Sequence, residues 1–461
     1  MGLILRLVRI PPPPHCRRWL SIRPAPPIDL IDLAVSLLTT IGARPSLGWL
    51  RGEKHSEIVV RSAGRAVAKR LVFHVSGYDP ITPHVGAQRR FVRELARFQL
   101  TWSVKTSIDG LRDSADQAKW NMTTTGPNWQ VETDYRLVWW DDVIETFSRR
   151  TIFWRIPFGV IAFLDFVVAD ALRGYLRTNW HYASFFLYPF VTFGLFVLAA
   201  GLFASKTSAS VPVGIGVGFL VFAALLVGPW RWLHLAPLFD DWIFSHEYVR
   251  KGNSILGQRL ERLAAEIVAA ARNSDADELL IIGHSLGAVI AIDLLDRALK
   301  LDPALGEREI PVTFLSIGSS ILKIGLHRGA TRFRAAVERV ARSPGIFWGD
   351  YQARVDIMNF YNKNPMTEMG LPTENGPVIK HVEFSRMLER KTYRRIRLRF
   401  FRMHCQFISG NDKRALYDYF MLVCGPVSAK SQTLAVDGAM SMIGADGALL
   451  QRGANRTGQA G

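Results

Sequence analysis

The chain has 461 residues, more than one ordinary domain, and 49% of them are hydrophobic, a fraction that predicts some lipid-facing surface. Its 57 Lys and Arg residues outnumber 40 Asp and Glu residues, for a net charge of +17. No zinc-ligand spacing, RNA-binding signature or Lys-rich tail accompanies this charge, so we expect membrane lipids and not nucleic acid as partners. The 3 cysteines fit neither a disulfide framework nor a metal site.

Residues 1–57 are predicted to form a basic, Pro-rich N-terminal arm. Residues 1–28 include several arginines and no carboxylate, and the prolines at 11–14 interrupt any helix. A transit peptide is the alternative. The apolar run before the prolines is a poor secretory signal, because arginines break it and no small-residue cleavage site follows.

Residues 58–150 show an alternation of strand and helix patterns. Apolar residues predict a strand at 69–75, a helix at 84–100 and a second strand at 135–140. Such alternation favours an α/β fold with a doubly wound, mostly parallel sheet.

Residues 151–250 are predicted to be a membrane insertion. Two charge-free runs, 183–204 and 209–230, are each long enough to cross a hydrocarbon layer of about 30 Å as a helix. Lys206 alone lies between them, whereas arginines flank both outer ends, so the positive-inside rule puts both large halves of the chain in the cytoplasm. A pair of buried core helices is the alternative.

A third apolar run, 151–171, contains Arg155, Asp165 and Asp170, whose charges would be costly in the middle of a bilayer. We interpret it as interfacial or packed on the protein. Segments 151–175 and 232–250 flank the predicted hairpin and could lie over a catalytic pocket.

A strand, a tight turn and a helix are predicted around Ser285. An apolar β-run from residue 278 leads into GHSLG at 283–287, and helical spacing of apolar residues follows to 295. A serine on such a turn needs glycine on both flanks, because side chains there would collide with the strand and the helix. The pattern predicts that Ser285 is a nucleophile.

With this motif the sequence resembles the α/β-hydrolase superfamily, most closely its lipase-like and esterase-like members, over roughly residues 58–425. The predicted membrane hairpin would be an insertion in that fold. The resemblance implies an oxyanion hole made by the backbone N–H of Leu286 and that of Tyr78, with Gly77 as the alternative. The chain departs from the family's His-Gly loop, since it has Ser76 before Gly77.

The second half of the predicted domain, residues 251–425, begins with a helix at 254–272. After the Ser285 motif come a strand at 311–317, a helix at about 327–342 and a strand at 346–353. In this family the triad acid follows that last strand.

For the acid, we favour Asp356 over Asp350. An alternative alignment takes residues 355–361 as the strand and places the acid position at Asn364. An ordinary solvated or capping role is the other interpretation of Asp356.

His404 is the expected general base, since it precedes a final helix that ends near Cys424. His381 lies in a predicted strand, 378–384, and a structural histidine is the alternative for His404 itself. The resemblance then implies hydrolysis of an acyl ester or thioester through an acyl-enzyme, without a metal or an organic cofactor.

Several expectations concern the rest of the chain. Alternating basic and apolar residues at 395–400 suit a strand with one wet face, in a basic segment that contacts anionic lipid or substrate or is simply solvated. Residues 426–461 are predicted to be a flexible tail. A catalytically weak hydrolase-fold scaffold is the alternative to an enzyme, and the oligomeric state is not predicted.

Overall fold

The computed structural model describes residues 66–78, 84–114, 116–207, 210–307 and 310–450, all of them within the unit Val59–Gly461. The predicted arm, residues 1–57, lies outside the described residues.

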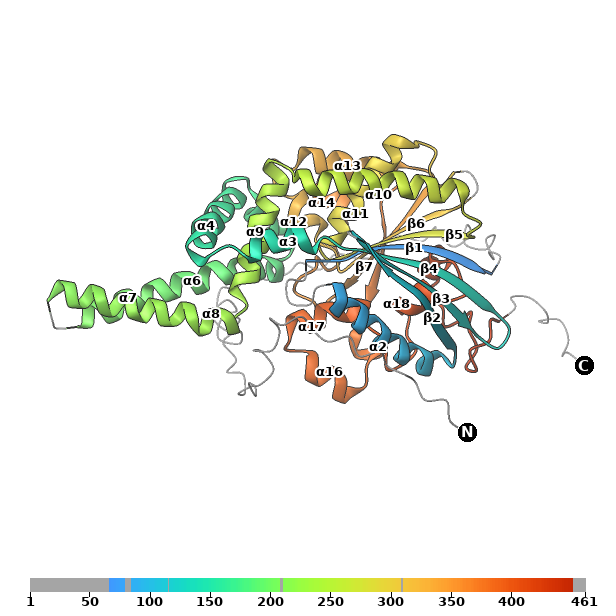
Figure 1. The fold of residues 1–461 in the computed structure, drawn as a ribbon, viewed down its shortest axis with the longest axis horizontal. Helices are drawn as coiled ribbons and strands as arrows, with labels where there is room; N and C mark the ends of the chain where they lie inside the picture. The colour runs from blue at the N-terminus through green and yellow to red at the C-terminus, as the bar shows by residue number, and fades with distance from the viewer. Residues whose placement is uncertain (1–65, 79–83, 115, 208–209, 308–309, 451–461) are drawn as a thin grey trace, which may run out of the picture. The chain divides into compact units, whose positions relative to one another are not determined.

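An eight-stranded mixed sheet lies at the centre of an α/β fold, with the strand order β2-β3-β4-β1-β5-β6-β7-β8 (Figure 1). The strands from β4 to β8 in this order are parallel, as the sequence predicts for most of the sheet. In chain order the strands are β1 (Lys69–Val75), β2 (Lys105–Asp113), β3 (Gln117–Thr125), β4 (Gln130–Val138), β5 (Glu278–His284), β6 (Val312–Ile317), β7 (Ile346–Ala353) and β8 (Val378–Val382).

The antiparallel edge strands β2 and β3 are absent from the sequence prediction. Most β2 side chains are exposed, and the strand carries several charged and polar residues, so it lacks the apolar alternation that identifies a half-buried strand.

Helices cover both faces of the sheet (Figure 1). Side chains alternate along each strand, so Leu71 and Phe73 of β1 enter one core and Val72 the other. The first core includes residues of α10 (Ser254–Asn273), α11 (Gly287–Leu301) and α13 (Thr331–Arg342). The second includes residues of α2 (His84–Trp102) and α18 (Tyr419–Cys424).

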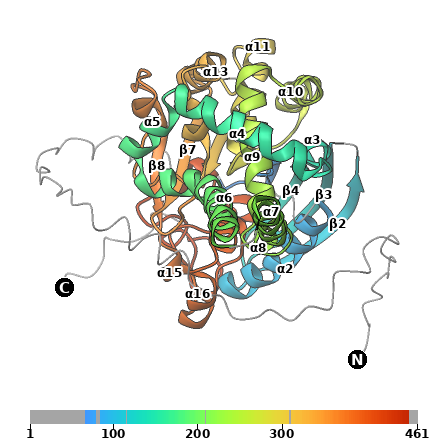
Figure 2. The same ribbon diagram turned by 90° about the vertical axis from the view of Figure 1, so that its left-hand side faces the viewer.

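A helical segment connects β4 to β5. Its helices are α3 (Asp141–Ser148), α4 (Ile152–Val168), α5 (Ala171–Thr178), α6 (Trp180–Lys206), α7 (Val211–Val227), α8 (Pro229–Trp232) and α9 (Leu235–Arg250). Figure 1 shows α6 and α7 extending side by side away from the sheet, and Figure 2 shows the pair end-on. In this pair, Gly214 and Gly218 of α7 approach Ala204 and Ala200 of α6 so closely that a Cβ would lie within 3.1 Å of their atoms.

Among the described residues, α6 is the one helix that is long and apolar enough to cross a membrane by itself. Helix α7 ends before Gly228 and Pro229. It therefore has 17 residues and is about 25 Å long. It is therefore shorter than the run predicted at 209–230. Helices α4 and α5 pass the same test only as a pair bent by 67°.

The charged residues of the third apolar run have partners on the protein. Arg155 Nε lies 2.6 Å from Asp240 Oδ1 of α9. Asp165 accepts hydrogen bonds from Arg250 and contacts His246 and His327. This run thus packs against α9 through ion pairs.

The basic segment before His404 is helical, so the strand predicted at 395–400 is wrong. It contains α15 (Phe384–Met387), α16 (Arg390–Ile396), α17 (Phe400–His404) and the 3₁₀ helix η3 (Cys405–Ile408). Ile396 is the buried side chain of α16, and Met403 and His404 are those of α17. Each of these helices is too short for its apolar residues to show a helical period, so the alternation of basic and apolar residues suggested a strand.

The tail predicted to be flexible from residue 426 instead packs on the domain as far as residue 450. Helix α19 (Ala429–Leu434) buries Ala429 and Thr433 completely. Further along, Trp129 Nε1 donates a hydrogen bond of 2.8 Å to the carbonyl of Gly447.

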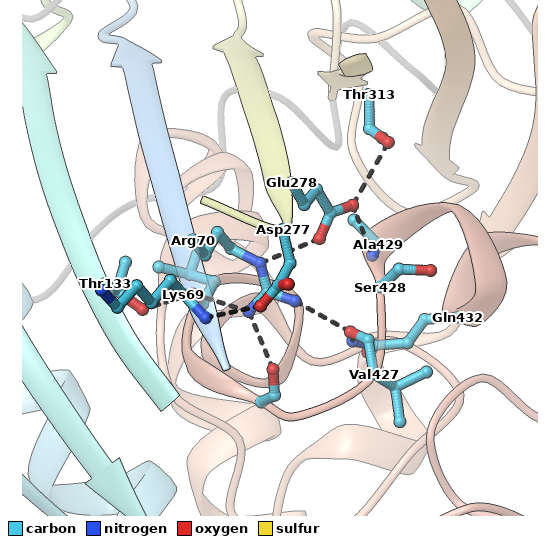
Figure 3. Close-up of polar contacts among 12 residues, drawn as sticks. Lys69, Arg70, Thr133, Asp277, Glu278, Thr313, Val427, Ser428, Ala429 and Gln432 are labelled. Atoms are coloured by element: carbon cyan, nitrogen blue, oxygen red, sulfur yellow. Dashed lines mark hydrogen bonds and ion pairs between the residues drawn. The ribbon is translucent and has the colours of Figure 1, made fainter. Parts of the chain in front are cut away.

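A buried ion pair explains why this segment is held (Figure 3). Arg70 Nε donates to Glu278 Oε2 over 3.0 Å, and the other guanidinium nitrogens donate to the carbonyls of Val423, Gly425 and Val427. Glu278 also accepts from the Ala429 N–H at 2.8 Å. A buried ion pair is stable only when its remaining donors and acceptors are hydrogen-bonded, and the start of the tail supplies several of these partners. The composition of the tail, rich in Ala, Gly and Ser, gave no sign of these contacts.

Candidate active site

Ser285 lies on a strained turn between β5 and α11. Its φ is +56°, a left-handed conformation that costs a residue with a side chain of order 1 kcal/mol or more. The turn is held by hydrogen bonds, since the Ser285 N–H donates to Ile317 O at 3.0 Å and the Ser320 N–H donates to Ser285 O at 3.1 Å. The surrounding structure therefore imposes this conformation on the serine.

Both glycines of the motif are required by close packing. A Cβ on Gly283 would lie 2.4 Å from Ala288 Cα, and one on Gly287 would lie 2.3 Å from the carbonyl oxygen of Val75. The neighbouring atoms belong to the backbone, so they cannot move aside as a side chain could. Strand, turn and helix thus meet as the sequence predicts.

The imidazole of His404 is bonded to a carboxylate that comes from a distant part of the chain. Its Nδ1 lies 2.7 Å from Asp356 Oδ2, and both side chains are buried. The other oxygen of Asp356 accepts the Met358 N–H at 3.0 Å. His404 Nε2 is buried and has no hydrogen-bond partner among the described residues, which leaves it available for a serine hydroxyl.

The alternative acids occupy different places. Asp350 lies within β7, where Ser316 Oγ and Gln352 Nε2 donate to its carboxylate and burial raises its pKa to about 6. Asn364 caps α14 (Pro365–Glu368) by accepting the Met366 N–H. The alternative strand at 355–361 does not form, because the chain turns there. The imidazole is therefore paired with Asp356.

The loop after β1 lies against Ser285. A Cβ on Gly77 would approach Ser285 Cβ to 2.9 Å and His284 O to 3.0 Å, so only glycine fits. Trp140 Nε1 donates to Ser76 O at 2.9 Å and anchors the loop. Because β1 pairs with β5, this places Gly77 and Tyr78 beside Ser285, where the predicted oxyanion hole would be.

Two other histidines lie at the site, although neither was proposed to act there. His284 Nε2 lies 3.3 Å from His404 O, and burial lowers its pKa well below the usual value. His74 Nδ1 lies 2.5 Å from Tyr135 OH and 3.0 Å from Tyr419 OH, and burial lowers its pKa to about 3. Both are neutral at pH 7. The sequence signal that could have identified them is their position. His284 lies next to Ser285 in the motif, and His74 lies on β1, which pairs with β5.

Ser285 borders two cavities. The larger, about 760 Å³, is also lined by His74, His284 and His404 and lies between α2 and α16–α17. The smaller, about 30 Å³, is lined by residues of α6, α9 and α12 (Ile321–Gly325). Segment 232–250, which includes α9, thus borders the small cavity beside Ser285.

The small cavity contains a buried ion pair. Lys323 Nζ lies 2.5 Å from Asp241 Oδ2 and 4.2 Å from the centre of the Trp242 ring, and burial lowers the pKa of Lys323. The hydroxyl of Tyr78 also faces this cavity and has no hydrogen-bond partner among the described residues. The wall next to Ser285 is therefore polar as well as aromatic.

Compared with known protein families, curated proteins and solved structures, the chain has no match. Within the described ranges, no group of three or more His, Cys, Asp or Glu side chains is placed to hold a metal ion. The site is therefore interpreted from its own geometry.

Proposed function

We propose that this protein is a membrane-anchored serine hydrolase of the α/β-hydrolase type, which cleaves an acyl ester or thioester. One observation carries the proposal: the strained Ser285 shares a cavity with a buried His404 that is oriented by Asp356 and has a free Nε2. His74 Nε2 is also buried without a hydrogen-bond partner among the described residues, but Nδ1 of His74 contacts tyrosine hydroxyls, whereas Nδ1 of His404 is bonded to a carboxylate.

The geometry supports an acyl-enzyme mechanism. His404 Nε2 takes the proton of Ser285 Oγ, which attacks the acyl carbonyl and forms a tetrahedral oxyanion. The N–H groups of Leu286 and of Tyr78 or Gly77 stabilise that oxyanion. The imidazolium, stabilised by Asp356, protonates the leaving alcohol or thiol, and water activated by His404 then releases the acid.

The membrane anchor in this proposal is the pair α6–α7. Residues on the outer faces of both helices are apolar and exposed, among them Leu195, Leu202, Ile215 and Leu220. The chain must cross the bilayer an even number of times between β4 and β5, because both strands pair with β1 in one sheet. We therefore infer that both halves of the domain are cytoplasmic and that Lys206 lies at the far membrane surface.

The topology is tested with a Lys206→Cys variant in intact cells, in a background where the native cysteines are replaced. A membrane-impermeant maleimide is expected to label it from outside, whereas a cysteine at Arg328, an exposed residue between α12 and α13, should react only after permeabilisation. Labelling of both positions only after permeabilisation would exclude a hairpin that crosses the bilayer.

The catalytic proposal is tested by labelling detergent-solubilised protein with a fluorophosphonate. Wild type is expected to react, Ser285→Ala not at all, and His404→Ala at a strongly reduced rate. Absence of labelling in well-folded wild type would favour a non-catalytic scaffold with a hydrolase-like fold.

A further inference from the structure

The large cavity beside Ser285 has a strongly basic lining. Three of its arginines, Arg90, Arg93 and Arg97, project from α2, and two, Arg395 and Arg402, come from α16 and α17. Glu94 is the single carboxylate among the described residues that line it. The lining of the cavity that contains His404 therefore carries an excess of positive charge.

The arginines of α2 are already engaged. Arg93 and Arg97 pair with Glu94 at 3.0 and 3.1 Å, and Arg90 lies 3.3 Å from the sulfur of Cys405. Arg395 and Arg402 differ, because neither guanidinium group has an ion pair or a hydrogen bond with any described residue. Two guanidinium groups at the cavity are thus available for a ligand.

The leaving group of the proposed reaction lies on the same side of Ser285 as His404. His404 must protonate the leaving atom, so the leaving alcohol or thiol departs next to His404. Arg395, Arg402 and His404 line the same cavity. A group attached to the leaving atom therefore enters the cavity that these two arginines line.

We propose that the substrate carries an anionic group, a phosphate or carboxylate, on its alcohol or thiol portion, and that Arg395 and Arg402 bind it. This inference rests on the proposed function. Guanidinium groups bind phosphate and carboxylate oxygens through paired N–H donors. Phe91, Ile396 and Phe401 supply an apolar wall in the same cavity, which suits an amphiphilic ester.

The test compares two esters with the same acyl chain in neutral detergent: an acylglycerol and its phosphorylated counterpart. We expect wild type to favour the phosphorylated ester in kcat/KM by at least about tenfold, since a hydrogen bond between charged groups contributes about 1.5–3 kcal/mol. Arg395→Gln and Arg402→Gln should each lower kcat/KM for that ester by about ten- to a hundredfold and leave the neutral ester within about twofold.

Arg394→Gln is the matched control, because Arg394 is exposed on the same helix but does not line the cavity. It should leave both rates unchanged. Equal rates for the two esters, or equal losses on both in the variants, would overturn the inference.

Two sources of the anionic group are separated by a second pair of probes. A phosphorylated acylglycerol is presented in vesicles, and a water-soluble acyl thioester of a phosphorylated thiol is presented without lipid. Arginine-dependent turnover of either supports the inference and identifies the source. Loss of vesicle binding in the variants with unchanged turnover of both probes would mean that the arginines contact the bilayer only, which contradicts it.

Failure of this inference is distinguishable from failure of the proposed function. Ser285-dependent turnover of the neutral ester without a preference for phosphate rejects the anionic substrate alone. No turnover of any ester, together with no fluorophosphonate labelling, rejects both.

Discussion

His404 and Asp356 are 48 residues apart in the chain, yet the imidazole Nδ1 and the carboxylate Oδ2 lie 2.7 Å apart and are buried together. This pairing engages Nδ1 of His404 and leaves Nε2 without a hydrogen-bond partner among the described residues. It also distinguishes Asp356 from the two other residues considered for the same role.

Asp356→Asn is expected to lower the rate of fluorophosphonate labelling by roughly 10³–10⁴-fold, because an amide neither stabilises the imidazolium nor holds the required tautomer. Asp350→Asn and Asn364→Asp should stay within about tenfold of wild type, since neither residue contacts His404. A larger loss in Asp350→Asn than in Asp356→Asn would assign the acid to Asp350.

Asp350→Asn should change how stability depends on pH. Burial raises the pKa of Asp350 to about 6, above the ordinary 3.8, so between these values the folded state binds more protons than the unfolded state. The stabilising contribution of Asp350 to the free energy of unfolding is therefore fully present below pH 3.8 and is lost as pH rises through 6. The variant lacks this loss, so its thermal midpoint relative to wild type should be higher at pH 8 than at pH 4.5. An identical difference at both pH values would contradict this.

Tyr78→Phe should leave stability unchanged or slightly raised, because the Tyr78 hydroxyl is buried without a partner. Labelling of Ser285 should also be unchanged, since the proposed oxyanion donor is the backbone N–H. Tyr135→Phe is the matched control: its hydroxyl contacts His74 and Tyr419, and its loss should cost about 1–3 kcal/mol in denaturant unfolding. A tenfold fall in labelling of Tyr78→Phe would give the hydroxyl a part in the reaction.

Gly287→Ala should abolish labelling and lower the thermal midpoint, because its Cβ would lie 2.3 Å from a backbone oxygen of β1. Gly257→Ala, at the fourth residue of α10, provides the comparison. Its Cβ would meet only the far end of Arg297 at 3.8 Å, so this helix should gain about 0.5–1 kcal/mol. Wild-type labelling in Gly287→Ala would contradict the described turn.

Arg70→Gln should destabilise the domain by about 3–5 kcal/mol, because it leaves Glu278 charged, buried and unpaired. Lys69→Gln removes a neighbouring pair with Asp275 that is exposed on both sides and should have no measurable effect. Denaturant unfolding of the two variants compares them directly. Equal stability would show that the tail, residues 427–450, is held by other contacts.

The local elements could be predicted from the sequence where the apolar pattern is strong. The strands at 69–75 and 346–353 have the predicted bounds, and the helix from residue 254 ends within one residue of its prediction. The pattern failed at the antiparallel edge of the sheet, where β2 is mostly exposed and polar, and in the basic segment, where α16 and α17 are too short to show a helical period. It also failed for the tail, whose order comes from contacts with distant residues such as Arg70.

The sequence by itself determined the turn around Ser285, since glycines on both flanks, an apolar strand before and a helix after are local requirements of backbone geometry. Only the tertiary structure decided which residue faces His404, because Asp350, Asp356 and Asn364 are all close to the same strand in sequence and only Asp356 reaches the imidazole. It also decided which arginines of the cavity have no side-chain partner among the described residues. Pairing between distant residues depends on how the loops fold in three dimensions, and local periodicity carries no information about that.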